Sequence, residues 1–301
     1  MSLRAVAVDG TRLRAQGQLA DFLMLTKPRV VLMVLVTTTV GYYLGSTGVL
    51  DGLRLLQTLF GTALAAAGTI ALNQYLERDG DALMERTRLR PLPDGRIEPA
   101  RALLFGVAIT LGGLAYQALT VDLLTCLVTA LTAASYLFLY TPLKRKTCLC
   151  TIPGAISGAL PPVTGWVAAR GEFGPGAWVL FGILFLWQIP HSLGIAWLYR
   201  EDYARGGIRL LPVVEPEGYS TARQVVSNCL ALLAVGLMPT IIGITGSAYF
   251  LGALALGMGF LGCGVLLAVS RSVGDARRLV YASLVYLPAL LVLMALNKVA
   301  F

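Results

Sequence analysis

The sequence contains little charge, a single histidine and no regularly paired cysteines. Charged residues make up 13% of its 301 residues, against about 25% in a typical soluble domain. The five cysteines lie mostly within apolar runs and show no paired spacing, so we expect free thiols rather than a disulfide scaffold. Hydrophobic residues make up 56%, which argues against a disordered chain and a nucleic-acid-binding domain, although the net charge is +8. The composition favours a protein that crosses a membrane several times.

Nine apolar stretches are long enough to cross a bilayer. A helix needs roughly 20 apolar residues to span the hydrocarbon core. We therefore predict an all-α fold, a polytopic membrane protein with nine transmembrane helices. The stretches lie near residues 28–50, 53–76, 102–120, 121–140, 151–169, 176–198, 225–245, 248–270 and 279–296.

The positions of lysine and arginine predict how the chain is oriented. Cytoplasmic loops of membrane proteins carry an excess of these residues. With the N-terminus in the cytoplasm, all of the 24 except Arg54, Arg170 and Lys298 fall on the cytoplasmic side. We therefore expect a cytoplasmic N-terminal segment over residues 1–24, a transmembrane domain over residues 25–301, and a C-terminus on the far side.

Two long loops on the predicted cytoplasmic side are rich in acidic residues. Residues 77–101 and 199–223 together hold ten of the sixteen Asp and Glu residues. The preference of cytoplasmic loops for positive charge explains arginine and lysine there, but it gives no reason for carboxylates. The two loops are therefore the first place to look for a functional site.

The first acidic loop begins with a regular pattern of oxygen-bearing side chains. If the helix continues through Gly80, then Asn73, Glu77 and Asp81 recur every four residues and share one face, about 6 Å apart along the axis. Asp79 points to another side. Oxygen ligands of this kind favour Mg²⁺. Because Asn73 and Asp81 are too far apart for one ion, the pattern suits two ions, or one ion and a substrate with several oxygens.

Arginines follow this pattern within twenty residues: Arg78, Arg86, Arg88, Arg90 and Arg96. The guanidinium fork matches phosphate oxygens. Acids and arginines mixed in this way suit a metal-bridged, multiply anionic ligand such as a diphosphate. A solvated loop with internal salt bridges explains the pattern equally well, although a polar residue at membrane depth such as Asn73 usually has a function.

The second acidic loop gives a weaker signal. Glu201 and Asp202 could bind a second ion, with Arg200, Arg205 or Arg209 on phosphate. No four-residue carboxylate pattern exists there, so a plain loop next to the membrane fits better. A third cluster comprises Lys144, Arg145 and Lys146. The bias toward positive cytoplasmic loops is enough to explain it.

Several segments resemble the UbiA superfamily of intramembrane prenyltransferases, and within it the family of protohaem IX farnesyltransferases. Asn73-Gln-Tyr-Leu-Glu-Arg-Asp-Gly-Asp81 is typical of the superfamily. Pro190-His191 and the segment from Asp202-Tyr203 to Leu211-Pro-Val-Val214 are typical of the haem-modifying family. The remaining matches, in family order, are residues 25–30 (LTKPRV), 86–93 (RTRLRPLP), 140–145 (YTPLKR) and 158–166 (GALPPVTGW).

The resemblance implies a fold, a reaction and a location. It implies a UbiA-type bundle around a central cavity, with its active site toward the cytoplasm of a bacterial inner membrane. The implied reaction joins farnesyl diphosphate to haem B in haem biosynthesis and releases haem O and diphosphate. Mg²⁺ would be the cofactor and haem B a substrate, not a permanent cofactor. The lipid bilayer, and haem A synthase or terminal-oxidase assembly factors, are the implied partners.

The resemblance also implies roles for individual residues. The superfamily has Asp where Glu77 stands, the second loop lacks a full carboxylate set, and Arg209 replaces an expected proline. The implied metal ligands are Asn73, Glu77, Asp81 and Asp202, and these four with Arg86, Arg90 and Lys144 are the implied catalytic residues. The implied substrate-binding residues are Arg78, Tyr140, Arg145, His191, Arg200 and Tyr203.

The mechanism that we expect separates charge inside a dry cavity. Mg²⁺ and cationic side chains would neutralise the departing diphosphate, and aromatic faces would stabilise the allylic cation. The haem vinyl group would attack this cation, and water would then add. His191 either contacts haem iron or bonds to a neighbouring helix, two interpretations of equal weight. Tyr136, Tyr140, Trp187 and Trp197 lie on suitable helices, but ordinary packing explains them equally well.

Two other functions remain open from the sequence. A related enzyme that prenylates an aromatic acceptor should carry two full carboxylate patterns, and the second is incomplete here. A polytopic transporter should carry charges along the centres of its spans. Here the acids gather at predicted cytoplasmic helix ends, which favours chemistry on an amphiphile.

Overall fold

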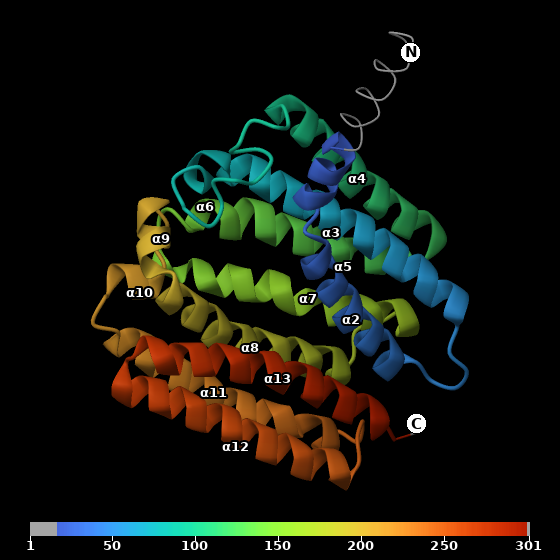
Figure 1. The fold of residues 1–301 in the computed structure, drawn as a ribbon. Helices are drawn as coiled ribbons and strands as arrows, with labels where there is room; N and C mark the ends of the chain where they lie inside the picture. Colours follow the sequence, from blue (N-terminus) through green and yellow to red (C-terminus); the bar gives the residue numbers. More distant parts are fainter. Residues whose placement is uncertain (1–16, 300–301) are drawn as a thin grey trace, which may run out of the picture.

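The computed structural model describes residues 17–299, and in that range it is a bundle of helices without a named strand (Figure 1). Residues 1–16 of the predicted N-terminal segment lie outside the described residues. The predicted all-α class is confirmed. The long helices are α2 (Pro28–Gly45), α3 (Gly52–Asp81), α4 (Pro99–Thr120), α7 (Thr151–Arg170), α8 (Pro175–Leu198), α11 (Tyr219–Ile241), α12 (Ser247–Ser270) and α13 (Val273–Leu296).

Shorter elements complete the chain. Between α4 and α7 runs one membrane-length segment made of α5 (Leu123–Ala134), a π-helical turn η1 (Ser135–Tyr140) and α6 (Thr141–Leu143). A 3₁₀ turn, η2, precedes α7, and two short helices, α9 and α10, follow α8. Their bounds are Cys148–Cys150, Arg200–Arg205 and Leu211–Val214.

Eight helical segments of the described chain are long and apolar enough to cross a membrane, so the protein is a multi-pass membrane protein. They correspond to all the predicted spans except the one near residues 151–169. That stretch forms α7, which has the length of a span but contains many glycine, alanine and proline residues. Because α7 runs through the middle of the bundle (Figure 1) and most of its side chains are buried, it needs little apolar surface for lipid. The count of nine spans stays a prediction.

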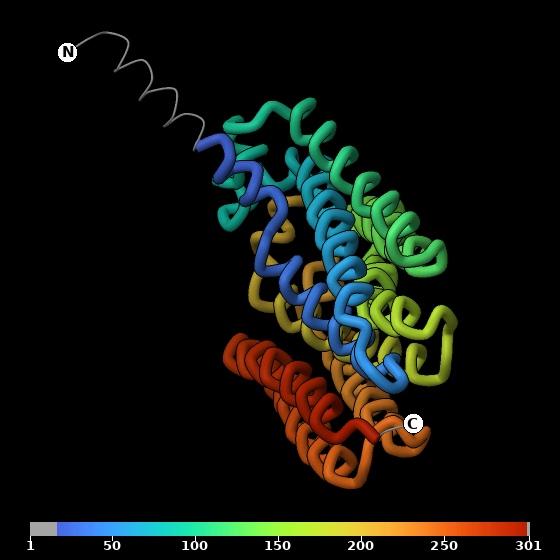
Figure 2. Tube along the Cα trace, turned by 90° about the vertical axis from the view of Figure 1, so that its right-hand side faces the viewer, coloured from blue at the N-terminus to red at the C-terminus, as the bar shows by residue number. Residues whose placement is uncertain are grey.

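The helices are arranged in layers around α7 and α8. From one side of the molecule to the other, the order is α4, α3, α7, α8 and then the C-terminal group α11–α13 (Figure 1), and the turned view shows this group as a separate layer (Figure 2). Helix α2 crosses the front of α3 and α7 (Figure 1). Large apolar side chains such as Leu119 and Leu296 are exposed on the outer surface, as expected for residues that face lipid.

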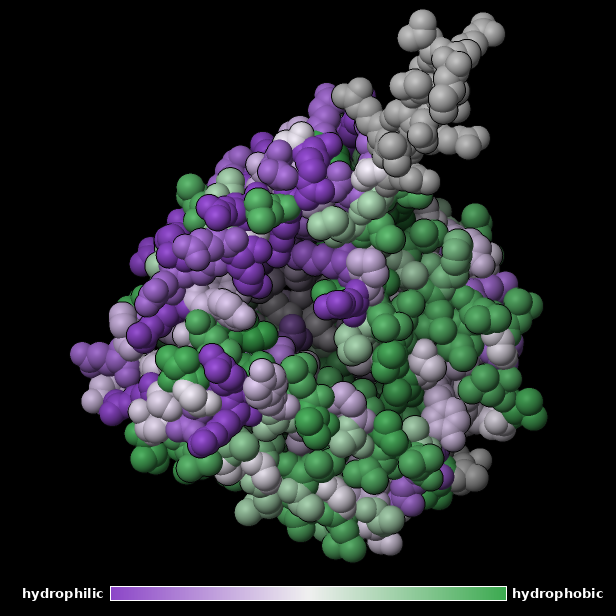
Figure 3. All heavy atoms as spheres, viewed as in Figure 1, coloured by the Kyte–Doolittle hydropathy of each residue, from purple (hydrophilic) through white to green (hydrophobic). Residues whose placement is uncertain are grey.

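The two ends of the bundle differ in polarity. Hydrophilic side chains gather over α9 and the loops beside α6, next to a hollow in the same face (Figure 3). At the other end, Arg54 pairs with Asp122 at 2.7 Å. Nearby, Arg170 donates to the carbonyl of Gly45, and Lys298 donates to the carbonyls of Tyr43 and Ser46. The three cations expected outside thus lie together, while the orientation of the bundle across the membrane stays a prediction.

Helices α2 and α7 cross at close range because small residues face each other. A Cβ on Gly41 would overlap the carbonyl oxygen of Pro162, and a Cβ on Gly165 would overlap the carbonyl oxygen of Thr38. Small residues at such crossings let the two backbones approach inside a membrane. The crossing keeps α2 against α7, and both helices line the apolar cavity described below.

We expect Gly165→Ala to lower the free energy of unfolding by about 1–3 kcal/mol, because overpacking forces backbone shifts. Thermal unfolding in detergent, followed by tryptophan fluorescence, measures this effect. Gly112→Ala is the matched control, since no atom lies within 4 Å of the added Cβ. There the melting temperature should stay the same or rise, because alanine is favoured over glycine in a helix. Equal melting temperatures for Gly165→Ala and Gly112→Ala would contradict the close contact between α2 and α7.

Candidate active site

A polar cavity of about 190 Å³ lies at the hydrophilic end of the bundle. Four cations and two carboxylates line it, so the cavity carries an excess of positive charge. Such an arrangement favours an anion with more than one negative charge. The six charged residues are Lys27, Glu77, Asp81, Arg86, Arg90 and Lys144.

The end of α3 supplies the acidic side of this cavity. The predicted continuation of the helix through Gly80 is confirmed, since α3 ends at Asp81. Asn73, Glu77 and Asp81 all line the polar cavity, and Asn73 and Asp81 are only 1% and 2% exposed. Asp79, in contrast, has a side chain that is 78% exposed. The four-residue spacing therefore separates the carboxylates that face the cavity from the one that does not.

Each of the two carboxylates in the polar cavity has its own cation. Glu77 Oε1 lies 2.7 Å from Lys144 Nζ, and Asp81 Oδ2 lies 2.6 Å from Arg90 Nη1. Burial alone would lower the pKa of Lys144, but the neighbouring Tyr140 and Glu77 hold the pKa above its ordinary value. Lys144 therefore stays charged. The two pairs satisfy the carboxylates, while Lys27 and Arg86 remain as surplus positive charge.

The π-helical turn η1 brings a second group of polar atoms to the same place. The ring of Pro142 clashes with an α-helical carbonyl four residues earlier, and a π turn avoids this clash. In the widened turn, both the backbone N–H and the hydroxyl of Thr141 donate to the carbonyl of Tyr136. Asn73 Nδ2 donates to Thr141 Oγ1 at 3.0 Å, and Tyr136 donates to Asn73 Oδ1 at 3.4 Å. The turn thus ties the amide of Asn73 in place.

Two tyrosines from this turn lie between the polar cavity and a second cavity. The rings of Tyr136 and Tyr140 have centroids 5.3 Å apart. Lys144 Nζ lies 4.2 Å from the centroid of Tyr140. Both tyrosines line the polar cavity and also an apolar cavity of about 280 Å³. A ligand that fills both cavities must pass these rings.

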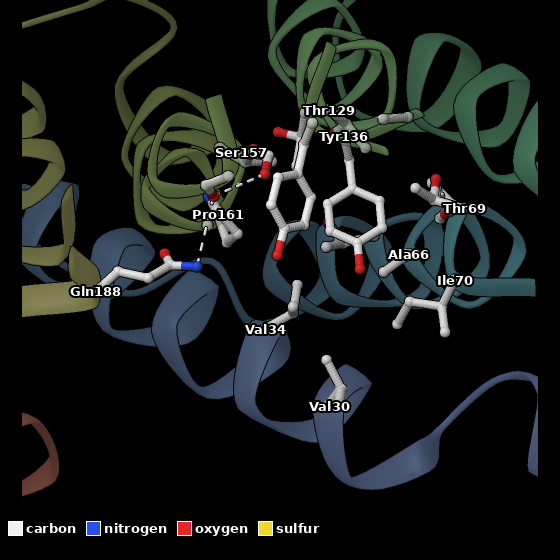
Figure 4. A pocket seen from close by; sticks show the side chains of 18 residues that line it. Val30, Val34, Ala66, Thr69, Ile70, Thr129, Tyr136, Ser157, Pro161 and Gln188 are labelled. Atoms are coloured by element: carbon white, nitrogen blue, oxygen red, sulfur yellow. Dashed lines mark hydrogen bonds between the residues drawn. The ribbon is translucent and has the colours of Figure 1, made fainter. Parts of the chain in front are cut away.

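The apolar cavity is built from small and aliphatic side chains of five helical segments. Val30 and Val34 come from α2, Ala66 and Ile70 from α3, and Pro161 from α7 (Figure 4). Gln188 of α8 reaches in from the side and donates to the carbonyl of Gly154 (Figure 4). Along α3 the lining continues back to Thr62, eight residues or about 12 Å before Ile70. The cavity therefore has the depth and polarity to hold a hydrocarbon chain.

Lys27 is a site residue that the sequence interpretation missed. It lies in one of the segments that resembled the superfamily, but no role was given to it. Its backbone is left-handed, with φ 45° and ψ 69°, directly before Pro28, a position from which the right-handed helical region is disfavoured. Burial, and then the charges of Arg90 and Lys144, lowers the pKa of Lys27 to about 8. The Lys-Pro pair was the available signal.

Asp202, in the second acidic loop, does not line the polar cavity. Its side chain instead supports the first acidic loop. The carboxylate of Asp202 accepts hydrogen bonds from the backbone N–H groups of Glu85 and Arg86, at 2.9 and 3.4 Å, and from Arg205 at 2.9 Å. Burial alone would raise the pKa of Asp202, but these donors lower it. Tyr203 does line the polar cavity, and its hydroxyl accepts from Arg86 at 3.3 Å. Helix α9 thus positions the arginine-bearing loop.

The remaining candidates lie around the polar cavity or away from it. Arg145 lines a small adjoining pocket with Glu77. Arg78 donates to the carbonyl of Tyr75, and Arg200 lies over the ring of Trp197 beside a separate surface pocket of about 490 Å³. His191 bonds to a neighbouring helix, as one of its two interpretations predicted, and lines neither the polar nor the apolar cavity.

A metal ion at this site would need ligands beyond acidic side chains. Among the described residues, no group of three or more His, Cys, Asp or Glu side chains could hold an ion. The two carboxylates of the polar cavity and the amide oxygen of Asn73 are all oxygen donors, which suits Mg²⁺ completed by ligand phosphates. All five cysteines, which the structure shows free, lie outside this cavity.

Comparisons with known proteins agree with this geometry. The model of the UbiA prenyltransferase family matches residues 34–296. The chain is 49% identical over 287 residues to the protoheme IX farnesyltransferase of Solibacter usitatus, covering 92% of this chain and 98% of that protein. It is 43% identical over 277 residues to the enzyme of that name from Salinibacter ruber, with 92% and 98% covered. For Aquifex aeolicus the identity is 39% over 285 residues, with 94% and 97% covered.

Solved structures share the fold at low sequence identity. One, from a study of digeranylgeranylglyceryl phosphate synthase in membranes, superimposes with a TM-score of 0.80 at 18% identity, covering 93% of this chain and 98% of that one. A UbiA homolog from Archaeoglobus fulgidus bound to GPP and Mg²⁺ gives a TM-score of 0.65 at 18% identity, with 91% and 99% covered.

We expect the affinity for inorganic diphosphate to fall as the pH rises through about 8, because Lys27 then loses the charge that attracts the anion. Calorimetric titration across this pH range measures the effect. Lys27→Arg should keep the affinity to higher pH, and Lys27→Gln should weaken binding and remove the inflection. Any change in the protonation of the diphosphate itself over this pH range affects all variants equally. Lys146→Gln, at an exposed position, should behave as wild type; an inflection that survives in Lys27→Gln would refute the assignment.

Proposed function

Because the chain belongs to the UbiA prenyltransferase family, we propose that it transfers the farnesyl group of farnesyl diphosphate to a vinyl group of haem B, giving haem O and diphosphate. Relatives that match more than nine-tenths of the chain are named protoheme IX farnesyltransferase. One observation carries the proposal: a cation-rich polar cavity and an apolar cavity share Tyr136 and Tyr140. A prenyl diphosphate has a matching polyanionic head and hydrocarbon tail.

The diphosphate would bind among the cations of the polar cavity. Lys27 and Arg86 are not paired with a carboxylate there, so they are the first contacts in the proposal. Arg90 and Lys144 would turn from their carboxylates to phosphate oxygens. Arg145 and Tyr203 border the same space, while Arg78 and Arg200 are assigned to the outer approach. Asp202 acts as a positioning residue through the loop that carries Arg86.

Mg²⁺ fits the oxygen donors that this exchange would release. Because Asn73 and Asp81 are too far apart to share one ion, Glu77 would hold Mg²⁺ with either Asp81 or the amide oxygen of Asn73. The phosphates would complete the site, because Mg²⁺ typically binds through a few carboxylates plus substrate oxygens. When bound, it would neutralise charge on the diphosphate as the carbon–oxygen bond breaks. We assign Asp202 the positioning role, because three donors already bind its carboxylate.

The farnesyl chain would lie in the apolar cavity, with its reacting carbon at the two tyrosines. Their faces can stabilise a cation by roughly 0.5–2 kcal/mol each. The diphosphate leaves with the electron pair, the vinyl carbon forms the new carbon–carbon bond, and water adds to the resulting haem cation with loss of a proton. Water must stay away from the first cation, and the apolar lining provides this. Trp187 and Trp197 do not line this cavity.

We further propose where the reaction takes place. Residues 25–301 would form the catalytic domain in a bacterial inner membrane, with the polar cavity toward the cytoplasm. The distribution of cations supports this orientation. The apolar product would pass within or along the membrane to haem A synthase or to a terminal-oxidase assembly factor.

An assay with purified protein, haem B, farnesyl diphosphate and Mg²⁺, analysed by mass, tests the proposal. We expect the haem to gain one farnesyl group and one hydroxyl group, and we expect a chelator to stop the reaction. If the haem gains no mass while an aromatic acid is prenylated under the same conditions, the proposal is wrong.

We expect Glu77→Gln and Asp81→Asn each to lower kcat by about 10²–10³-fold, the size seen when one transition-state contact is removed. Each change removes a charge that holds the metal and balances a cation. Asp79→Asn is the control, because it changes the same residue type on the same helix at an exposed position. Normal turnover by either cavity variant would exclude the proposed metal site. Impairment of Asp79→Asn alone would exclude it as well.

A further inference from the structure

Three buried threonines lie at the end of the apolar cavity that is farthest from the two tyrosines. Thr62 comes from α3, Thr129 from α5 and Thr164 from α7, and all three line this cavity. Helices α3 and α5 run toward the polar end of the bundle, while α7 runs away from it. Each threonine is therefore the cavity residue of its own helix that lies deepest. We call these three side chains the threonine floor.

The space behind the threonine floor is filled by protein. One turn farther from the tyrosines, the same helices carry Thr58, Thr125 and Ala168, which are fully buried and do not line the cavity. Beyond them, Arg54 of α3 donates to Asp122 at the start of α5, at 2.7 Å, and to the carbonyl of Ala168 on α7, at 2.6 Å. These bonds hold the three helices together, so a ligand cannot pass the floor without breaking them.

The hydroxyl groups of the floor are already engaged in hydrogen bonds. Thr129 and Thr164 each donate to the backbone carbonyl four residues earlier on their own helices, at 3.1 and 3.4 Å. The hydroxyl of Thr62 accepts from Gln117 at 2.9 Å, and Gln117 belongs to α4, which does not line the cavity. With these oxygens bonded elsewhere, the floor can meet the end of a hydrocarbon chain with methyl groups.

The depth of the cavity follows from the helical rise. Thr129 lies seven residues before Tyr136, and Thr164 lies ten residues after Gly154, which packs against Tyr140. At about 1.5 Å per residue, these separations are about 10 and 15 Å. Geranyl, farnesyl and geranylgeranyl main chains have seven, eleven and fifteen bonds, so at about 1.2 Å per bond they reach about 8, 13 and 18 Å when extended. The farnesyl chain matches the depth, and geranylgeranyl exceeds it.

We propose that the threonine floor limits the prenyl chain to three isoprene units, which makes Thr62, Thr129 and Thr164 specificity-determining residues. The inference rests on the proposed function, because it places the prenyl chain in the apolar cavity with its reacting carbon at the tyrosines. A longer chain would overpack the floor, or its end would leave the cavity past Val30, a lining residue of α2 that is exposed. Either course weakens binding relative to a chain that ends at the floor.

Calorimetric titration of the full-length protein with geranyl, farnesyl and geranylgeranyl diphosphate, with Mg²⁺ and without haem, tests this inference. In wild type we expect geranylgeranyl diphosphate to bind about 5- to 150-fold more weakly than farnesyl diphosphate, the range that overpacking gives. A double variant with Thr129→Ala and Thr164→Ala should bring the two affinities close together, because it deepens the cavity. Thr129→Leu should weaken farnesyl diphosphate by a similar factor and leave geranyl diphosphate unchanged, because it raises the floor.

Thr37→Ala is the matched control, since that hydroxyl bonds only to carbonyls of its own helix and the residue lines neither cavity. It should keep the wild-type ratio of affinities. If Thr129→Leu does not fold, the double alanine variant decides, because it adds no volume.

Two results would overturn the inference and leave the proposed function in place. One is equal affinity of wild type for farnesyl and geranylgeranyl diphosphate, and the other is an unchanged ratio in the double alanine variant. The expected ratios in a protein that forms no farnesylated haem would support the inference and reject haem B as the acceptor. Failure of all three diphosphates to bind would reject both the inference and the proposed function.

Discussion

Two carboxylates at the end of α3, one buried and one partly buried, set the main constraint on this structure. Asp81 is buried and Glu77 partly buried, and each needs a cation beside it, because an unpaired buried charge costs several kcal/mol. Lys144 comes from the segment after the π turn and Arg90 from the loop after α3. Meeting this electrostatic requirement therefore draws two distant parts of the chain around one helix end. Removing either cation would leave a buried charge uncompensated, at a cost of about 3–5 kcal/mol.

Charged side chains at the opposite end of the bundle also have partners, but most of these partners are backbone carbonyls. There Arg54 pairs with Asp122, while Arg170 and Lys298 bind carbonyls at the end of α2 and just beyond it. Cations near helix C-termini are favoured by the helix dipole. The contacts of Arg170 and Lys298 use backbone carbonyls, which a polyanion does not replace. At the polar end the pairs are between side chains, which a polyanion with a metal ion can exchange.

Much of the site could be predicted from the sequence because it follows from one periodicity. The spacing of Asn73, Glu77 and Asp81 placed them on one helix face and set Asp79 apart. Lys27 was missed because its side chain reaches the cavity through a left-handed backbone, which spacing does not encode. The contacts of Asp202 with the loop at residues 85–86 join positions more than a hundred residues apart. Periodicity shows which residues share a face, but not which faces meet.

The pairing of the carboxylates also couples the binding of the metal ion to the binding of the diphosphate. If Glu77 and Asp81 take a metal ion, Lys144 and Arg90 lose their partners at the same moment. These cations are then partly buried and unpaired, a costly state, until a diphosphate supplies the missing negative charge. A diphosphate alone would likewise strip the carboxylates of their cations. Metal and diphosphate therefore stabilise each other in the polar cavity, and departure of the diphosphate restores the two ion pairs seen here.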